Sequence, residues 1–462
     1  QRPIYRGLQS LDEEDADILL GRDAPIAEGL AALRRMRNGS AKSMLVILGA
    51  SGAGKSSFLK AGLLAQLKRD EMNFLVLPVI RPERAALSGT YGMAASLSCD
   101  PACLKDLPEL VNLLARLRAP IVKRFGRIAE SSGESCAARP PTIVIPIDQA
   151  EELFSAENSE AGHVFELLAG AVRADTDTII VATIRSDAFE KLQDEPRLAD
   201  VQLLPFSLTR LPRGAFKEVI EGPARLATPP LHIEPALTEQ LLRDLDAGDA
   251  LPLLAFTLQR LWLRHRGGGT LTLAEYVDDL GGLQGAITGA VEAAFAEAQQ
   301  DAAVPRDRVE LERLARAAFI PSLVQLDDAD GEPRRRVERL NALPEATLPL
   351  VRHLINQRLL VSDWSTIDGT ETDTVEVAHE TILRQWPTLR AWIREERDAL
   401  RALDGVRAAA AEWDKHKDPG QPDQSQSWLT HHGNRLEEAE TLTTRRDFAK
   451  ALRAGEIEYL SA

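Results

Sequence analysis

Cysteine is scarce in this sequence. The 462 residues contain three cysteines, Cys99, Cys103 and Cys136, and no Cys or His lies near Cys99 and Cys103 to complete a zinc site. A small, odd number of cysteines argues against a disulfide scaffold and fits a reducing compartment. We therefore expect a cytoplasmic protein.

Long apolar runs are also missing. No uninterrupted run approaches the roughly 18 residues of a transmembrane helix, so we expect no membrane partner. The first residues, Gln1–Ile4, lack Met and do not resemble a signal peptide. We expect a segment of a longer protein.

Basic residues are in the minority. Lys and Arg number 55 against 70 Asp and Glu, which gives a net charge of -15. Such a surface repels a phosphate backbone, so we do not expect this segment to bind nucleic acid. The basic run Arg334–Arg336 could still contact an anion, but a solvated loop is the simpler interpretation.

Apolar residues, at 44%, are numerous enough for several cores, and the length predicts two to four domains. Four regions differ in pattern: residues 1–205, 206–280, 281–398 and 399–462. The last is charged and helical, and we interpret it as a linker region. It is interrupted near Pro419.

The first region alternates short apolar runs with helical stretches. The runs are nearly all apolar, which is typical of parallel strands with helices on both faces. This predicts an α/β fold, and residues 128–141 read as a surface loop. The predicted strands are 44–48, 74–77, 143–147 and 178–182.

The second and third regions read as mostly helical. A hairpin with arms 359–364 and 374–378 follows the last predicted helix, with Asp368-Gly369 at its turn. Helices followed by a hairpin suggest a winged-helix domain at 281–398, after a helical domain at 206–280. The predicted helices are 214–226, 237–245, 252–263, 286–298, 309–318 and 347–358.

The strongest motif is Gly49-Ala50-Ser51-Gly52-Ala53-Gly54-Lys55-Ser56, a full G-x-x-x-x-G-K-[ST] phosphate-binding loop between a strand and a helix. The glycines allow backbone N–H groups to face phosphate oxygens, and the helix N-terminus adds a positive dipole end. Lys55 can reach the β- and γ-phosphates of ATP or ADP, and Ser56 can ligate Mg²⁺. The nucleotide contacts expected from this motif are Gly49, Gly52, Gly54, Lys55, Ser56 and Ser57.

A second apolar strand ends in Asp148, which in a P-loop fold lies beside the Mg²⁺ site. Glu151 or Glu152 could orient an attacking water. Both acids would also suit a helix N-terminus, where negative charge is favoured without any catalytic role.

Four further residues have a functional and a structural interpretation. Arg185 follows another strand at the same sheet edge and could sense a γ-phosphate, or it could form a surface ion pair with Asp187. Arg22 precedes a helix, Pro252 lies at a helix start, and His379 follows the second hairpin arm. Their spacing alone favours a structural role for each.

Taken together, these motifs resemble the bacterial novel STAND NTPases, which are signal-transduction ATPases with numerous domains. The resemblance runs from about residue 4 to about residue 460. The segments that carry it are Tyr5-Arg6-Gly7-Leu8, Asp12 to Ala16, Gly21-Arg22-Asp23, the phosphate-binding loop, Asp148 to Phe154, Thr183 to Asp187, Val377-Ala378-His379-Glu380 and Leu383-Arg384-Gln385-Trp386-Pro387.

The resemblance implies a module that closes around ADP at rest, exchanges it for ATP, opens and oligomerises. An effector domain and a sensor domain would lie outside this segment, in bacterial signalling or defence. It also implies that His379 contacts the ADP β-phosphate and that Pro252 packs near the adenine. Two motifs differ from the family pattern: Ala378-His379-Glu380 replaces Met-His-Asp, and Ala250-Leu251-Pro252 replaces Gly-x-Pro.

Three functions are compatible with these residues. The first is a switch with slow ATP hydrolysis. The second is an AAA+-like ATPase that loads or remodels DNA and uses the winged helix to bind it, which the net charge of -15 disfavours. The third is an interaction scaffold whose nucleotide is only structural.

Overall fold

The computed structural model describes residues 3–39, 43–50, 52–82, 85–132, 139–154, 160–175, 177–245, 250–327, 331–367, 370–416 and 428–462. The chain forms two compact units. The first comprises Gln1–Tyr276 with Thr366–Thr370, and the second comprises Val277–Ser365 with Glu371–Ala462. The finer division into four domains stays a prediction.

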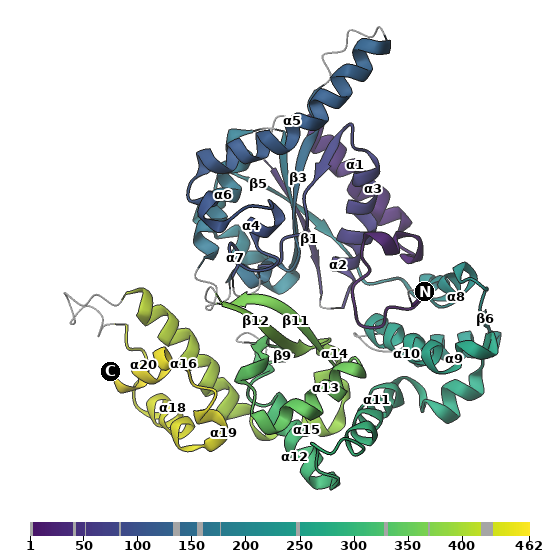
Figure 1. Ribbon diagram of the computed structural model, residues 1–462, viewed down its shortest axis with the longest axis vertical. Helices are drawn as coiled ribbons and strands as arrows, with labels where there is room; N and C mark the ends of the chain where they lie inside the picture. The colour runs from purple at the N-terminus through teal and green to yellow at the C-terminus, as the bar shows by residue number, and fades with distance from the viewer. Residues whose placement is uncertain are drawn as a thin grey trace. The chain divides into compact units, whose positions relative to one another are not determined.

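The first unit is built on a five-stranded parallel sheet with the strand order β2-β3-β4-β1-β5 (Figure 1). All its strands run in one direction, so their carboxyl ends share one edge of the sheet. The strands are β1 (Ser43–Gly49), β2 (Phe74–Val76), β3 (Thr142–Ile147), β4 (Thr178–Arg185) and β5 (Gln202–Ser207). The first four confirm the predicted strands.

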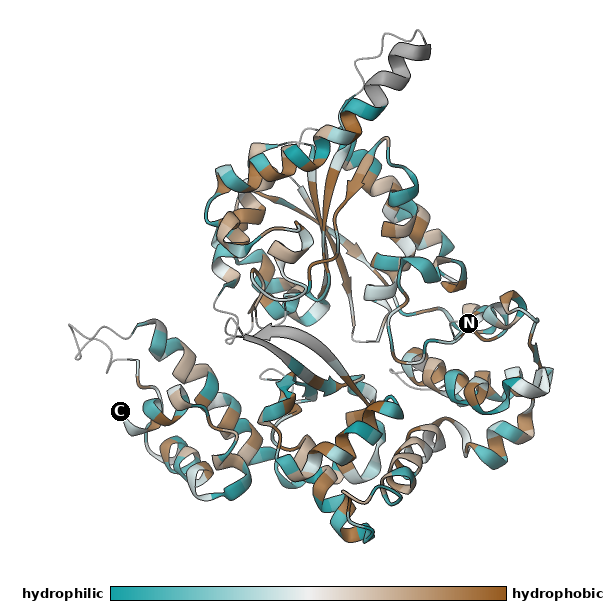
Figure 2. Ribbon diagram, in the orientation of Figure 1, coloured by the Kyte–Doolittle hydropathy of each residue, from teal (hydrophilic) through white to brown (hydrophobic). Residues whose placement is uncertain are grey.

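Helices cover both faces of this sheet, which is why its strands read as apolar runs (Figure 2). On one face, Leu45, Ile47 and Val181 pack against α1 and the helix that follows the phosphate-binding loop. On the other face, Val46 and Ile145 pack with residues of α4 to α6. The covering helices are α1 (Asp23–Asn38), α2 (Lys55–Ser57), α3 (Ala65–Arg69), α4 (Met93–Ser96), α5 (Leu107–Ser132), α6 (Ala161–Ala174) and α7 (Phe189–Gln193).

Two details of this unit differ from the prediction. The helix after the phosphate-binding loop continues through a π-helical turn, Phe58–Leu64, before it becomes α3. The loop expected at 128–141 is wrong for its first residues, because α5 extends to Ser132; residues 133–138 lie outside the described part of the chain.

A helical part completes the first unit. It contains α8 (Phe216–Leu226), α9 (Pro235–Asp244) and α10 (Ala250–His265), with the short parallel pair β6 (His232–Ile233) and β7 (Thr270–Leu271). These three helices confirm the predicted ones to within two residues at each end. The predicted turn at Gly248-Asp249 lies outside the described residues.

The second unit begins with α11 (Gly282–Ala298), α12 (Arg308–Phe319) and α13 (Leu348–Asn356). The predicted hairpin follows as β11 (Leu360–Ile367) and β12 (Thr370–Val377), and β10 (Glu338–Arg339) pairs antiparallel with β12. Residues 368–369 at the predicted turn lie outside the described residues. The expected helices and hairpin are therefore present, and the winged-helix classification stays a prediction.

The rest of the second unit is mostly helical, apart from the hairpin of β8 (Val324–Leu326) and β9 (Pro333–Arg335). Helix α16 packs against α18 and α20. The helices are α14 (Glu380–Gln385), α15 (Pro387–Glu395), α16 (Arg397–Lys415), α18 (Asn434–Thr444), α19 (Arg446–Ala449) and α20 (Ala454–Ser461). The predicted break near Pro419 lies outside the described residues.

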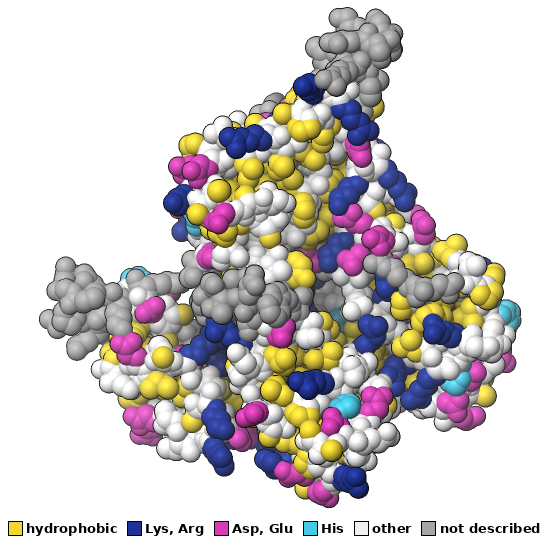
Figure 3. Space-filling view, viewed as in Figure 1, with side chains coloured by type: hydrophobic (Ala, Val, Ile, Leu, Met, Phe, Trp, Pro, Cys, Tyr) yellow, Lys and Arg dark blue, Asp and Glu magenta, His cyan; other side chains and the backbone are white. Residues whose placement is uncertain are grey.

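The basic run Arg334–Arg336 is not the solvated loop that the sequence suggested. Arg334 belongs to β9, is buried, and forms ion pairs with Asp327 and Glu380. Arg336 is also buried, and its guanidinium lies 3.6 Å from Asp404. Side chains of both signs are interspersed on the face of the molecule in Figure 3. The run is therefore part of an internal ion-pair network.

Candidate nucleotide-binding site

The predicted phosphate-binding loop connects the carboxyl end of β1 to the N-terminus of α2. Gly52 and Gly54 have φ angles of +74° and +85°, which a glycine adopts without strain. The backbone at Gly49 lies close to a neighbouring chain segment, because a β-carbon there would lie 3.0 Å from the carbonyl oxygen of Leu208. The glycines of the motif are thus required by the shape of the loop.

Lys55 extends back into this loop. Its ammonium group donates to the carbonyl oxygens of Gly49 at 2.9 Å and Ala50 at 3.0 Å, and the residue is only 9% exposed. This positive charge lies inside the curve of the loop, where the motif places the phosphates. The loop therefore fits a nucleoside phosphate.

Asp148 brings the ends of three elements together. Its Oδ1 atom accepts hydrogen bonds from Ser56 Oγ at 2.9 Å and from Thr183 Oγ1 at 2.7 Å. Ser56 lies in α2 and Thr183 in β4, while Asp148 directly follows β3. Hydroxyl and carboxylate oxygens are ligands that Mg²⁺ prefers, so Ser56 and Asp148 fit the predicted metal position.

The residue after Asp148 is strained. Gln149 has a φ of +59°, an uncommon conformation for a residue with a side chain. Its N–H donates to Thr183 Oγ1 at 2.8 Å, and its side-chain oxygen accepts from the guanidinium of Arg81 at 3.1 Å. These bonds fix the backbone as the chain leaves β3.

Glu151 lies beside the end of β4, where its Oε2 accepts a 3.2 Å hydrogen bond from the backbone N–H of Arg185. Burial raises the pKa of its carboxyl group above the usual range, and the nearby charge of Lys55 opposes that rise. A carboxyl with a raised pKa is a better general base than an ordinary one. Glu152 is half-buried in the same short helical turn, Ala150–Phe154.

Arg185 lies opposite Gly49 in the pairing of β1 with β4. Its guanidinium forms a two-pronged ion pair with Asp187, at 3.0 Å and 2.6 Å. The structural alternative for this residue, an ion pair with Asp187, is therefore present. The γ-phosphate contact stays a prediction. To form it, the guanidinium of Arg185 would have to turn away from Asp187.

Arg22 is buried behind the loop. Its guanidinium donates to the carbonyl oxygens of Ala53 and Thr209, each at 2.8 Å. Burial lowers the pKa of this guanidinium. Through these two bonds Arg22 ties the phosphate-binding loop to the segment after β5, so it positions the loop.

Two other predicted residues have local partners. Ser57 Oγ accepts a 2.9 Å hydrogen bond from the N–H of Leu11, which joins the N-terminal segment to the helix after the loop. Pro252 is buried in the first turn of α10. The neighbouring Leu251 lies next to the loop, because a β-carbon on Gly54 would be 3.6 Å from its Cδ2 atom. The start of α10 thus borders the candidate site.

His379 belongs to the second unit and is the N-cap residue of α14. Its Nδ1 atom accepts a 3.1 Å hydrogen bond from the N–H of Thr381. This is a structural role that the sequence did not specify. The contact of His379 with the ADP β-phosphate stays a prediction.

Sequence reasoning missed two side chains next to Asp148. The first is Thr183. It belongs to the segment Thr183–Asp187 that carries the family resemblance, but its polar side chain at the end of a strand was the only indication of a role in the site. Lys60 is the other: its ammonium lies 3.9 Å from Asp148 Oδ2 and 3.5 Å from Asp12 Oδ1. Its position one turn after Ser56 on the loop helix could have indicated it.

The described residues contain no cluster of three or more His, Cys, Asp or Glu side chains that could hold a metal ion by themselves. A metal at Ser56 and Asp148 would take its further ligands from nucleotide phosphates and water. In the same described residues, none of the helices combines the length and the apolar character that a membrane span requires.

The parallel sheet and the loop that ends β1 define the first unit as an α/β P-loop NTPase fold. Residues 4–421 match the family Novel STAND NTPase 1. The chain therefore belongs to the novel STAND NTPases, as the motifs indicated. No curated protein is a match for this chain.

Several solved structures are distantly similar. The Aeropyrum pernix ORC1 protein in complex with DNA is 12% identical, with 83% of this chain and 94% of that chain covered and a TM-score of 0.41. A Walker-type ATPase of Pyrococcus abyssi is 14% identical, with 82% and 98% covered and a TM-score of 0.35. Likenesses at this distance assign no ligand or partner to this chain.

Proposed function

We propose that this chain is a nucleotide switch that is closed with ADP and opens and oligomerises when ATP replaces it. Slow hydrolysis of ATP would return it to the resting state. A sensor and an effector domain outside this segment would supply the input and the output, in bacterial signalling or defence. Membership of the STAND family supports nucleotide binding, and the rest of the cycle is our proposal.

The observation that carries the proposal is the convergence of Lys55, Ser56 and Asp148 at one edge of the sheet. Lys55 and the loop N–H groups would hold the phosphates. Ser56 and Asp148 would hold Mg²⁺, which neutralises phosphate charge when it is bound. Thr183 keeps the Asp148 carboxylate oriented by its 2.7 Å hydrogen bond.

Discrimination between ATP and ADP would fall to Arg185 and Glu151. Arg185 could exchange its ion pair with Asp187 for the γ-phosphate, which ADP lacks. Glu151 is held by the backbone N–H of the same residue, so a movement of Arg185 would also shift the candidate base. A ligand moves a conformational equilibrium only by its differential affinity for the two states, and these contacts would supply that difference.

The first test is nucleotide binding by Lys55→Ala. The lysine contributes charge to phosphates and little to the core, so the variant should fold normally and lose tight ADP binding. Lys105→Ala removes an exposed lysine of the same unit and serves as the matched control. If folded Lys55→Ala binds ADP as tightly as the wild type in calorimetry, the site assignment is wrong.

Turnover separates a switch that hydrolyses ATP from a scaffold with a structural nucleotide. Asp148→Asn should weaken Mg²⁺-dependent ATP binding or turnover, while Glu151→Gln or Glu152→Gln should slow hydrolysis and spare binding. Phosphate release under single-turnover conditions measures both effects. Wild-type turnover in all three variants would refute the metal and water roles. A DNA affinity that falls steeply with salt would instead favour a DNA-remodelling ATPase.

A further inference from the structure

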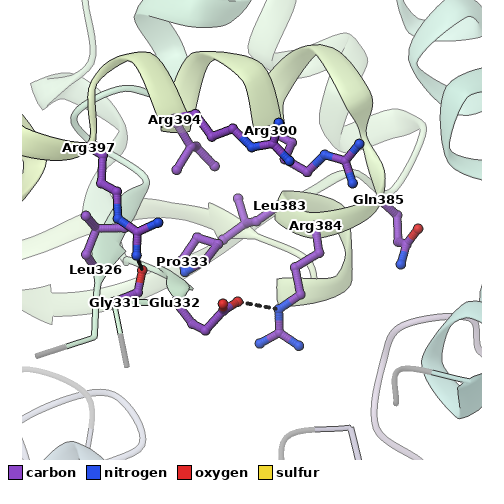
Figure 4. Close-up of a pocket in the computed structure, with 11 residues that line it drawn as sticks. Leu326, Gly331, Glu332, Pro333, Leu383, Arg384, Gln385, Arg390, Arg394 and Arg397 are labelled. Carbon is purple, nitrogen blue, oxygen red and sulfur yellow. Dashed lines mark hydrogen bonds and ion pairs between the residues drawn. The ribbon is translucent and has the colours of Figure 1, made fainter. Parts of the chain in front are cut away.

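The second unit contains a pocket of about 410 Å³ that the nucleotide site does not use (Figure 4). It lies between the end of the β8–β9 hairpin and helices α14 and α15. Leu326, Pro333, Leu383 and Ile393 give it apolar lining. A concave site of this size with an apolar lining suits a small ligand better than a flat protein surface does.

The motif Leu383-Arg384-Gln385-Trp386-Pro387 builds one side of this pocket. Trp386 is buried and packs edge-on against Phe319 and Trp392. Pro387 then begins α15. The buried tryptophan thereby fixes the corner at which α14 ends and α15 starts, so Leu383 and Arg384 line the pocket together with the arginines of α15.

Arginines form a stripe along this side. Arg390, Arg394 and Arg397 all line the pocket, and Arg401 continues their spacing on α16. Arg390 and Arg394 are four residues apart on α15, and Arg397 and Arg401 are four residues apart on α16, so each pair lies on one face of its helix. All four side chains are exposed. Figure 4 shows Arg390, Arg394 and Arg397 bordering the same hollow.

The opposite wall brings two of these guanidinium groups together. Gly331 has a φ of +67°, and its carbonyl oxygen accepts a 3.0 Å hydrogen bond from Arg397. A β-carbon on Gly331 would lie 2.6 Å from Nη2 of Arg397 and 2.7 Å from Nη2 of Arg401. Both positive charges therefore converge on one point of the backbone, an arrangement that a bound anion would stabilise.

The described acids around the pocket pair with other arginines. Glu332 and Glu380 face Arg384, at 3.8 Å and 3.6 Å. Glu395 and Glu396 pair with Arg316, and Glu396 also pairs with Arg445. Among the residues that the structure describes, no ion pair joins an acid to Arg390, Arg394, Arg397 or Arg401. Among the described lining residues, four arginines therefore face one acid, Glu332.

We propose that this pocket binds a small phosphorylated ligand, with Arg390, Arg394 and Arg397 on the phosphates and the apolar lining against a ring or hydrocarbon part. One guanidinium group can donate two parallel hydrogen bonds to the oxygens of a phosphate. Several arginines on one wall therefore match a ligand with more than one phosphate. The binding is independent of the P-loop, because every lining residue lies in the second unit.

Calorimetry on the full chain in the Lys55→Ala background, with EDTA present, tests the proposal without a contribution from the P-loop. Inorganic tripolyphosphate probes the arginines alone, and ATP probes the arginines together with the apolar lining. Tripolyphosphate should bind, and Arg390→Gln with Arg394→Gln should weaken its binding by at least about tenfold. Arg435→Gln with Arg446→Gln removes two exposed arginines elsewhere in the second unit and should leave the binding unchanged.

The outcomes separate the possible sources of binding. Tighter binding of ATP than of tripolyphosphate, lost with Pro333→Ala but not with the control pair, would place the nucleoside part of ATP against the apolar lining. Equal affinities for ATP and tripolyphosphate would show that the pocket recognises its ligand by the phosphates alone. The proposal is overturned if tripolyphosphate fails to bind, if the Arg390 and Arg394 pair binds it like the control pair, or if these arginines bind only single-stranded DNA. Circular dichroism and thermal melting confirm that each variant is folded.

Discussion

At the scale of single residues, the carboxyl group of Glu151 couples the candidate site to pH. Desolvation is the largest influence on it, and it raises the pKa in the folded chain above that in the unfolded chain. Between the two pKa values the folded state binds more protons, so the contribution of Glu151 to stability falls as pH rises through this window. Above both values the full cost of desolvating this half-buried charge remains.

Glu151→Gln should therefore make the chain more resistant to thermal unfolding at about pH 8 than the wild type, because it removes the buried charge. The difference should shrink as the pH falls through the ordinary carboxyl value of 4.5, because below it the wild-type residue is protonated in both states. Melting curves across this range measure the effect, with Glu152→Gln as the neighbouring control. A stability gap that does not change with pH would contradict the buried-charge interpretation.

The residues around Asp148 show how far sequence reasoning extends to a site. The position of Asp148 was predictable, because an acid that directly follows an apolar parallel strand lies at the sheet edge that holds the phosphate-binding loop. Its metal role stays a prediction. Thr183 was not predictable, because its role depends on which strand lies beside β3. That neighbour is β4, and Ile147 pairs with Ala182. This register is set by the tertiary structure and cannot be read from the local sequence. The hydroxyl of Thr183 then reaches Asp148 at 2.7 Å.

At the scale of elements, the four apolar strands were predictable and β5 was not. β1, β3 and β4 are covered on both faces and therefore read as apolar runs. β5 lies at the edge of the sheet, is half-exposed along its length and contains Pro205, which weakens any strand signal. Its pairing with β1 supplies the stabilisation that its sequence does not indicate.

The link between α1 and the phosphate-binding loop belongs to this scale. Arg22 precedes α1 and holds two backbone carbonyl oxygens, one of them in the loop. Arg22→Ala would leave the buried carbonyl oxygen of Ala53 without this donor, at a cost of roughly 1–3 kcal/mol, and would also remove the bond to the exposed Thr209. We expect a lower free energy of unfolding in urea and weaker ADP binding, since the loop loses its support.

Arg34→Ala removes an exposed arginine of the same helix and should change neither quantity. Arg22→Lys should recover part of the stability, because an ammonium can donate to one of the two carbonyl oxygens. If Arg22→Ala lowers stability but binds ADP like the wild type, Arg22 supports the fold and does not position the loop for its ligand.

At the scale of the whole molecule, the proposed switch requires the second unit to respond to the nucleotide held by the first. His379 is the residue that the family resemblance assigns to this task. It also caps α14 through its Nδ1 atom, so a simple deletion of the side chain would remove two functions at once. A variant that keeps one function and loses the other is needed.

His379→Asn provides that separation, because asparagine is a good N-cap but lacks the imidazole ring. A hydrogen bond to a charged phosphate contributes roughly 1.5–3 kcal/mol, so its loss should raise the ADP dissociation rate about tenfold or more. If His379 contacts ADP, both His379→Ala and His379→Asn should release ADP faster and should form oligomers more readily with ATP. If it only caps α14, His379→Asn should behave like the wild type and His379→Ala should be less stable. The ADP off-rate and the mass in solution, measured for both variants, decide between a phosphate contact and a helix cap.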